Sequence, residues 1–341
     1  MSTPAADGFF MPGEWAPHTR CWMAWPCRKD LWGAGLDAAC DAYAEVADAI
    51  SQFEPVTMIA RGDEVASVSM RTTAKVATLP LGHDDSWIRD NGPSFLVDRQ
   101  GNLAAVDWVF NSWGEKYKPY DLDAAVAEVL LDRIKVRRYA APLVLEGGAF
   151  HVDGEGTLVT TEQCLLNPNR NPGKSREEIE QALRDYLGVE KILWLPRGLV
   201  DDETDGHVDN LVTFVKPGTV LALTSNDAND ANHAILQDNL ARLRAFTDAQ
   251  GRQLEVIEVE QPKARYDGAG RRLGLSYVNL YIANGGVVMP VFEDANDQKA
   301  MDIVNKAFVG RKLTGVPSLD IVAGGGGIHC ITQQQPSGQA S

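Results

Sequence analysis

Cys330 is the residue whose type and surroundings point most directly to chemistry. It follows four glycines, an isoleucine and a histidine in residues 324–332. Because glycine has no Cβ, such a run lets the backbone approach a ligand or adopt positive φ angles just before a strand. A thiol after that turn could project into a cleft and act as a nucleophile. The alternative is a small buried core cysteine. A phosphate-binding loop fits poorly, because no Gly-Lys-Ser/Thr follows the glycines.

The base that serves this thiol is expected elsewhere in the chain. His329 is adjacent to Cys330, and adjacent side chains on a strand point to opposite faces. His207 is the better candidate, because Asp209 lies two residues further on and the two would share one face of a strand. An imidazole and a carboxylate together suit proton transfer and cation binding. The alternative is a structural or metal-binding His-x-Asp pair, and a second such pair exists at residues 151 and 153.

Two more carboxylates and one aromatic ring complete the set of candidates. Asp90 precedes an Asn-Gly-Pro turn, which places its carboxylate at the edge of an element, where it could serve a site or cap the turn. Trp87 could stack on a planar cation or belong to the core. Glu146 lies in the apolar run 140–150, so if buried it must be paired or hydrogen-bonded. A hydrogen bond from the second ring nitrogen of His207 would satisfy the Glu146 carboxylate.

These residues lie in segments that share one pattern, a polar or glycine-rich turn next to a short β-like run. The markers Asp90, Glu146, His207, Asn279 and Cys330 are separated in turn by 56, 61, 72 and 51 residues. A loose period of about sixty residues is typical of a repeated β-rich unit.

Helical periodicity lies between these segments. Apolar spacing predicts helices over residues 36–53, 175–187, 229–246 and 296–309. The second of these starts with an N-cap candidate, Ser175, and Glu178 follows it three residues later, which is the spacing of a capping box. Strands that alternate with helices predict an α/β fold.

The 341 residues contain no Pro/Ser/Gly-rich linker, so we expect one catalytic domain over residues 1–341. Its core should span about residues 8–336, with a tail over 337–341. The glutamine-rich end as a whole, residues 333–341, is expected to be solvated.

Charge and cysteine content limit the partners and the compartment. A net charge of −15 argues against nucleic acid and would favour a cationic small molecule. The N-terminus lacks a basic region followed by an apolar run, and no later apolar run is long enough to span a bilayer, so no membrane is expected. Five cysteines, an odd number without a CxxC pair, predict reduced thiols in the cytoplasm.

Five segments, in order along nearly the whole chain, resemble the agmatine deiminase family. That family belongs to the guanidino-group-modifying (pentein) superfamily, with the arginine deiminases and bacterial peptidylarginine deiminases. The matching strings are MPGEWAPHTRCWMAWP (11–26), SWIRDNGP (86–93), LEGG (145–148), TDGHVDN (204–210) and GGGGIHCITQQQP (324–336). The resemblance implies a five-bladed α/β propeller of pseudo-repeated ββαβ-type units around a central pocket. It also implies no cofactor, no metal and a homo-oligomer.

The resemblance assigns roles residue by residue. The catalytic residues it implies are Cys330, His207, Asp90, Asp209 and Glu146, and the substrate-binding residues are Trp87, Asp90 and Asp209. One position departs from the family pattern, which has asparagine where this chain has Gly327. We therefore expect the hydrogen bonds of that amide beside the nucleophile to be missing.

The expected reaction is the hydrolysis of agmatine to N-carbamoylputrescine and ammonia through a Cys330 thiouronium. The alternatives are a free or peptidyl-arginine deiminase, a metal-dependent amidohydrolase built on the His-x-Asp pairs, and a non-catalytic binding protein. The acidic cluster at residues 201–203 could face the distal amine of agmatine, or it could be a solvated loop.

Overall fold

The strands of residues 2–340, the part of the chain that the computed structural model describes, form five separate sheets. Each sheet repeats one arrangement. Its first two strands are antiparallel, and a third strand, reached through a helix, runs parallel to the second. This is the ββαβ unit expected from the sequence.

Two of the units have additional strands: β4 (Val76–Pro80) in the first, and β1 (Phe9–Phe10) and β18 (Gln339–Ala340) from the chain ends in the second. The first contains β2 (His18–Ala24), α1 (Lys29–Trp32), α2 (Leu36–Ile50), β3 (Val56–Ala60), α3 (Val65–Arg71), β4 and, from the C-terminal end, β17 (Gln333–Pro336). The second contains α4 (Ile88–Asn91), β5 (Ser94–Asp98), β6 (Asn102–Val109), α5 (Ser112–Glu115), α6 (Asp121–Ile134) and β7 (Arg137–Val144), with β1 and β18 at its edges.

The other three units have three strands each. The third contains β8 (Phe150–Val152), β9 (Thr157–Thr161), α7 (Glu162–Leu165), α8 (Arg176–Leu187) and β10 (Lys191–Leu195). The fourth contains β11 (Val212–Lys216), β12 (Thr219–Thr224), α9 (His233–Ala245) and β13 (Glu255–Glu260). The fifth contains β14 (Tyr281–Ala283), β15 (Gly286–Val291), α10 (Asp297–Ala307), β16 (Lys312–Pro317) and α11 (Leu319–Val322). Single 3-10 turns span Gly33–Gly35, Gly147–Ala149 and Val208–Asn210.

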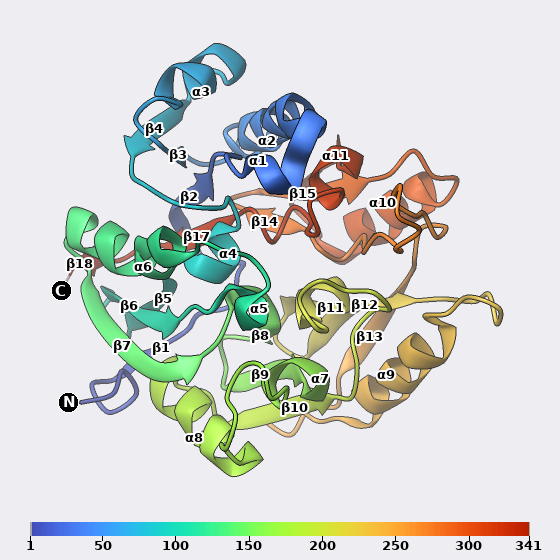
Figure 1. Ribbon diagram of the computed structural model, residues 1–341. Coiled ribbons are helices and arrows are strands. Elements are labelled where there is room, and N and C mark those ends of the chain that lie inside the picture. Colours follow the sequence, from blue (N-terminus) through green and yellow to red (C-terminus); the bar gives the residue numbers. More distant parts are fainter. Residues whose placement is uncertain (1, 341) are drawn as a thin grey trace.

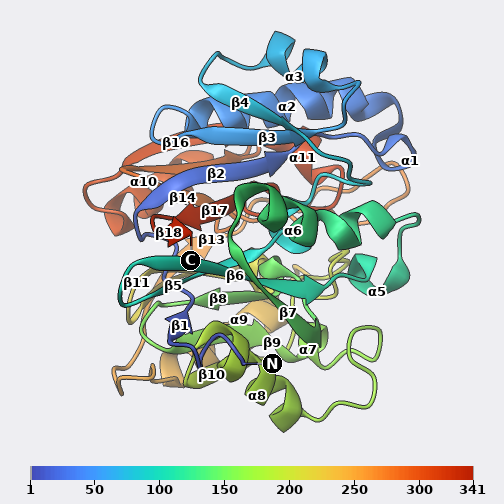
Figure 2. The same cartoon turned by 90° about the vertical axis from the view of Figure 1, so that its left-hand side faces the viewer.

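The units follow one another around the molecule, and the long helices α2, α8, α9 and α10 lie at its periphery (Figure 1). The view turned by 90° places α2 and α3 at one end and α8 at the other (Figure 2). The expected five-bladed α/β propeller is thus confirmed. The four predicted helices also exist as α2, α8, α9 and α10, shorter than predicted by one to five residues, and the capping box of Ser175 and Glu178 is formed.

The apolar core lies between neighbouring units. One cluster joins Leu240 of α9 and Val259 of β13 to Met289 of β15 and Val304 of α10. Another joins Val46 of α2 to the opposite side of β15. Since burial of apolar surface is the main driving force of folding, each unit is stabilised mainly by contact with the next one, and the ring must close.

The ring closes through the C-terminal end, where the prediction of a solvated tail is wrong. Strand β17 pairs with β2 in an antiparallel register over four residue pairs, from Gln333 opposite Trp22 to Pro336 opposite His18. Its glutamines are buried, and Gln335 Oε1 accepts a hydrogen bond from Trp22 Nε1 at 2.9 Å. The backbone of this strand forms the ladder hydrogen bonds with β2, and a glutamine amide can pair with a buried side-chain donor. A polar strand is therefore stable there. Beyond it, β18 pairs with β6.

The five marker residues occupy equivalent places. Asp90, Glu146, His207, Asn279 and Cys330 each lie two to five residues before the first strand of a unit, namely β5, β8, β11, β14 and β17. Equivalent turns of a closed ring of units meet near its axis. The loose sixty-residue period is therefore the spacing of the units, and its markers converge because of the ring.

No helix among residues 2–340 is long and apolar enough to cross a membrane.

Removing β17 should destabilise the whole ring. A chain that ends after Thr332 loses four residue pairs and exposes the edge of β2. At ~1 kcal/mol for each hydrogen bond, before any loss of apolar burial, we expect the free energy of unfolding to fall by about 4 kcal/mol or more. Urea unfolding followed by circular dichroism measures this. A control chain that ends after Gly338 loses only β18 and should unfold close to the full-length protein. Equal midpoints for the two truncated chains would contradict the closure.

Candidate active site

Cys330 lies in a turn that helix α4 holds in place. Residues 328–331 form a turn and not the strand assumed in the sequence argument, because β17 begins only at Gln333. The backbone N–H of Arg89 in α4 donates to the Cys330 carbonyl at 3.2 Å. Its Nε donates to the His329 carbonyl, also at 3.2 Å. The helix that carries Asp90 is therefore fixed to the turn that carries the thiol.

The Cys330 thiol is buried, with 3% of the residue exposed. Its Sγ lies 3.5 Å from Asp209 Oδ2 and 3.4 Å from Asn279 Nδ2. Burial, followed by the charges of Asp209 and Asp90, raises the pKa of Cys330 well above its ordinary value. Without a bound cation the sulfur is therefore a thiol, and not the reactive thiolate.

An asparagine amide from another part of the chain, that of Asn279, lies beside the nucleophile although position 327 is glycine. Its Nδ2 faces the sulfur of Cys330, and its Oδ1 accepts a hydrogen bond from the His329 backbone N–H at 2.9 Å. A Cβ added at Gly327 would lie 2.3 Å from that same Oδ1. In this chain glycine at 327 leaves room for the amide of a different unit.

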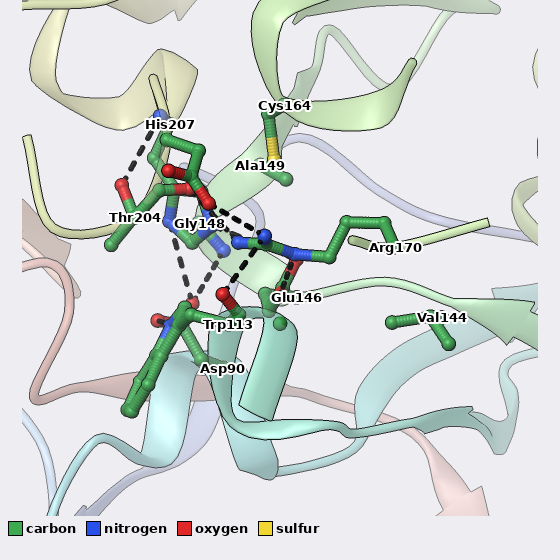
Figure 3. Close-up of polar contacts among 12 residues, drawn as sticks. Asp90, Trp113, Val144, Glu146, Gly148, Ala149, Cys164, Arg170, Thr204 and His207 are labelled. Carbon is green, nitrogen blue, oxygen red and sulfur yellow. Dashed lines mark hydrogen bonds and ion pairs between the residues drawn. The ribbon is translucent and has the colours of Figure 1, made fainter. Parts of the chain in front are cut away.

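His207 lies among three acidic or polar groups and has no hydrogen-bond partner on its ring. Its Nδ1 is 3.8 Å from Asp90 Oδ1, and its Nε2 is 3.7 Å from Glu146 Oε2 (Figure 3). Burial alone would lower the pKa of His207, but the charge of Asp90, with Cys164 and Glu146, raises it well above the ordinary value. The ring is therefore an imidazolium, which can give a proton.

The prediction that His207 and Asp209 share one face of a strand is wrong in its premise. Residues 208–210 form a 3-10 turn that precedes β11. Both side chains nevertheless reach the same place. A Cβ added at Gly148 would lie 2.6 Å from His207 Nδ1, 2.8 Å from Asp209 Oδ2 and 3.0 Å from Asp90 Oδ1. Gly148 is thus the point against which the imidazole and both carboxylates pack, and only glycine fits there.

The two carboxylates have different partners. Asp90 accepts hydrogen bonds from Gly148 N at Oδ1 and from Trp113 Nε1 at Oδ2, both at 2.9 Å. Asp209 accepts one from His329 Nδ1 at Oδ2, also at 2.9 Å, while its buried Oδ1 has no partner. An unpartnered buried carboxylate oxygen is costly, and a cationic N–H donor would relieve that cost.

Glu146 is buried and paired as the sequence required, although its main partner is another residue. Arg170 Nε donates to Glu146 Oε1 at 2.6 Å, whereas His207 lies beside the other oxygen (Figure 3). The pKa of Glu146 is lowered because the Arg170 charge, with His207, outweighs burial. Glu146 therefore remains ionised next to His207.

A small pocket opens beside the thiol. Cys330, Asp90 and three glycines, residues 324–326, line it, together with four apolar or aromatic side chains: Leu31, Trp87, Trp113 and Tyr117. Glu203 also lines it, and so it is the member of the acidic cluster that reaches the site. Asp202 instead caps the turn at Thr204 and Gly206.

Trp87, predicted to bind substrate, forms one wall of this cavity. Its ring stacks on Trp32, with the ring centroids 5.9 Å apart. On the Gly326 side the fit is close, since a Cβ added at Gly326 would lie 2.5 Å from the Trp87 ring and 3.0 Å from Cys330 Cβ. The glycine run is thus needed for the approach of an aromatic wall to the thiol.

Two buried groups could offer donor atoms to a metal ion: Glu14 with His151 and His329, and Glu146 with Cys164 and His207. In each group the carboxylate already pairs with an arginine, Arg89 in the first and Arg170 in the second. A metal ion would face that positive charge at close range, so neither group is well suited to a cation.

Several residues of the site carried no signal in the sequence. Trp113 lies in the short element α5 and Arg170 in the loop between α7 and α8, and their contacts with Asp90 and Glu146 connect them to the site. Gly148 lies in the family-like segment LEGG, residues 145–148, but the sequence assigns it no separate role. Asn279 was noted only as a marker of the repeat, and that equivalence with Cys330 could have indicated its place.

The arrangement can hold a planar cation between two carboxylates, with a thiol beside it and an acid nearby. Donor N–H groups of a guanidinium match carboxylate oxygens geometrically. The thiol can attack the carbon of such a group, and His207 can supply a proton.

Comparison with known proteins agrees with this geometry. The chain is 45% identical to the agmatine deiminase of Stutzerimonas stutzeri over 98% of both chains. Its structure matches that of the agmatine deiminase of Enterococcus faecalis with a TM-score of 0.96 and 40% identity, over 99% of this chain and 98% of the other. It matches a C. jejuni agmatine deiminase with substrate bound with a TM-score of 0.90 and 29% identity, over 97% of each chain.

The model of the family described as Porphyromonas-type peptidyl-arginine deiminase matches residues 10–336, a range that contains all the site residues described above. The chain therefore belongs to the family of Porphyromonas-type peptidyl-arginine deiminases.

Proposed function

We propose that the protein is an agmatine deiminase, which hydrolyses agmatine to N-carbamoylputrescine and ammonia through a covalent intermediate on Cys330. The observation that carries the proposal is the placement of Asp90 and Asp209 at a buried thiol, with Asp209 Oδ1 unpartnered. Relatives of similar length and high identity are agmatine deiminases, which supports the same substrate.

Binding of the guanidinium prepares the nucleophile. Asp90 and Asp209 take the paired N–H donors of the planar cation, which places its central carbon in front of Cys330 Sγ. The positive charge offsets the two carboxylates that hold the pKa of Cys330 high. With substrate bound, the thiol thus loses its proton to solvent more readily, so substrate helps to activate the group that attacks it.

The first chemical step forms a carbon–sulfur bond and releases ammonia. The Cys330 thiolate adds to the guanidinium carbon, and the tetrahedral intermediate breaks one carbon–nitrogen bond. The departing nitrogen takes a proton from the imidazolium of His207 and leaves as ammonia. An S-alkylthiouronium remains on Cys330. Glu146 keeps its charge beside His207 and favours the protonated ring before this transfer.

The second step is hydrolysis. His207, now neutral, takes a proton from a water molecule, which adds to the thiouronium carbon. The carbon–sulfur bond then breaks, and the proton of the new hydroxyl group passes to the departing sulfur, which releases the ureido product and returns the thiol of Cys330.

The cavity lining favours agmatine over free arginine. Agmatine carries an ammonium and no carboxylate at its far end. The charged residues that line the cavity are Asp90 and Glu203, both acidic. Tyr117 donates its hydroxyl to Glu203 Oε2 at 3.2 Å, which orients this carboxylate. A binding site for an α-carboxylate would need a basic residue in that lining.

Replacement of the nucleophile tests the chemistry. Cys330→Ser should lower ureido-product formation by more than about 1,000-fold, because a hydroxyl is a far weaker nucleophile than a thiolate. A colorimetric ureido assay on agmatine, arginine and an arginine-containing peptide measures both activity and substrate choice, and thermal unfolding checks the fold. Near-normal turnover in Cys330→Ser would end the covalent mechanism, and equal or better wild-type activity on arginine would overturn the choice of agmatine.

Glu203 should set the affinity for the far end of the substrate. We expect Glu203→Gln to raise KM for agmatine about tenfold, since a charge-assisted contact of ~1.4 kcal/mol is lost. Arg271, which forms an ion pair with Glu203, provides the matched control. Arg271→Ala leaves the carboxylate in place and should not raise KM. An unchanged KM in Glu203→Gln would show that the ammonium binds elsewhere.

Gly148 tests the convergence of the three reacting groups. Its substitution by alanine places a methyl group against His207, Asp209 and Asp90, and kcat/KM should fall by roughly 100-fold because these groups must move. Gly62→Ala is the control, as a Cβ at Gly62 meets nothing within 4 Å. Activity of Gly148→Ala similar to that of the control would contradict the described geometry.

A further inference from the structure

His329 lies between two carboxylates and has no direct part in the steps above. Its Nδ1 is 2.9 Å from Asp209 Oδ2, and its Nε2 is 2.9 Å from Glu14 Oε1. All three residues are buried. An ionised carboxylate can only accept hydrogen bonds, so a ring that donates to two of them carries protons on both nitrogens. The geometry therefore indicates an imidazolium held between two anions.

Glu14 lies in residues 11–26, the first of the five family-like segments, and the proposed reaction assigns no role to that segment. It lies in the segment that enters β2, and Arg89 Nη1 donates to its Oε1 at 3.3 Å. Arg89 also binds the His329 carbonyl through Nε. Glu14 and Arg89 thus hold His329 from two sides, and both are far along the chain from it.

The ionised state of Asp209 depends on His329 more than the ionised state of Asp90 depends on its own hydrogen-bond donors. Asp90 is held by two neutral donors, Gly148 N–H and Trp113 Nε1–H. Asp209 has no exposed surface, and its side-chain hydrogen bonds come from His329 at 2.9 Å and from the neutral Cys330 thiol at 3.5 Å, so His329 is the charged partner among them. Without a positive partner, a fully buried carboxyl next to another carboxylate tends to take up a proton. A protonated Asp209 could not grip a guanidinium as a carboxylate does.

We propose that His329, held by Glu14, is a positioning residue that keeps Asp209 ionised and aimed at the substrate guanidinium. This inference rests on the proposed function, because the guanidinium is the group that Asp209 binds. His329 makes its contacts on the side of Asp209 Oδ2, which leaves the unpartnered Oδ1 for the substrate. His329 and Cys330, adjacent in one turn, thus have different roles in the same site: His329 positions Asp209, and Cys330 is the nucleophile.

Four groups face the His329 ring: Asp209 and Glu14 at its nitrogens, Arg89 at Glu14 and at its own carbonyl, and His151 against its face with the centroids 4.7 Å apart. Burial lowers the pKa of His151 to about 4, so His151 is neutral. The pKa of His329 is raised, since its two anions outweigh burial and the Arg89 charge. In turn His329, opposing burial, lowers the pKa of Asp209.

The sign of the pH effect follows from these directions. Loss of the His329 charge raises the pKa of Asp209, so Asp209 takes up its proton at a higher pH. Agmatine binding, which needs the ionised carboxylate, should then be lost at a higher pH as the solution is acidified. A purely structural role for His329 would lower stability without moving this midpoint.

Calorimetric titration of agmatine into Cys330→Ser, as a function of pH, separates binding from turnover. Adding His329→Asn, which keeps a donor amide but no charge, should weaken binding about tenfold at pH 6 and move the acid midpoint upward by about one pH unit. His233→Asn is the matched control, since His233 lies at the start of α9 and bonds only the Ser225 carbonyl. An affinity and midpoint equal to those of the control overturn the positioning role.

The role of Glu14 is tested on His329 itself. In protein labelled with ¹³C at histidine, the His329 resonance is the one missing from His329→Asn. Glu14→Gln should move its titration toward the ordinary value of ~6.5, because one of its two anions is removed. An unchanged titration overturns the part assigned to Glu14. If His329→Asn does not fold, the His329 resonance is the one that remains after the other five histidines are assigned from their own His→Asn variants, and the same titration decides the matter. Failure of Cys330→Ser to bind agmatine at all would instead overturn the proposed function.

Discussion

Two carboxylates that face a buried thiol are the arrangement on which the rest of the site depends. Asp90 and Asp209 together raise the pKa of Cys330, and each is buried at a cost that its neighbours only partly offset. A planar cation would offset both the buried carboxylate charge and the raised pKa of Cys330, because it would donate to Asp209 Oδ1 and stabilise the thiolate. Under the proposed mechanism the sulfur is therefore a thiol until a guanidinium binds.

The fold makes this arrangement possible by repetition. Each unit presents the turn before its first strand to the centre of the ring, and the five turns supply Asp90, Glu146, His207 with Asp209, Asn279, and Cys330. Contacts between units then fix these turns to one another, as Arg89 does when it binds the carbonyls of His329 and Cys330. The strand β17 connects the nucleophile directly to ring closure, so stability and chemistry share one element.

Much of this could be predicted from the sequence, and the failures have physical causes. Four long helices and the sixty-residue period could be predicted because periodicity and turn residues are local signals, whereas the long helix α6 was not predicted. The assignment of strands to residues 207–209 and 329–330 failed because glycine-rich turns and strand starts share the same residues. The buried strand of glutamines was missed because composition suggested a tail, whereas its partner β2 is three hundred residues away in the chain. Pairings such as Glu146 with Arg170 and Asp209 with His329 are set by the ring and have no local signature.

The central claim is that the Cys330 sulfur becomes bonded to the carbon of the substrate guanidinium during turnover. Mass spectrometry of acid-quenched reactions with agmatine, sampled from the first milliseconds to steady state, tests this most directly. The account predicts a transient mass increase equal to agmatine minus ammonia, confined to the peptide that contains Cys330. Release of ureido product while this peptide stays unmodified at every quench time would contradict it.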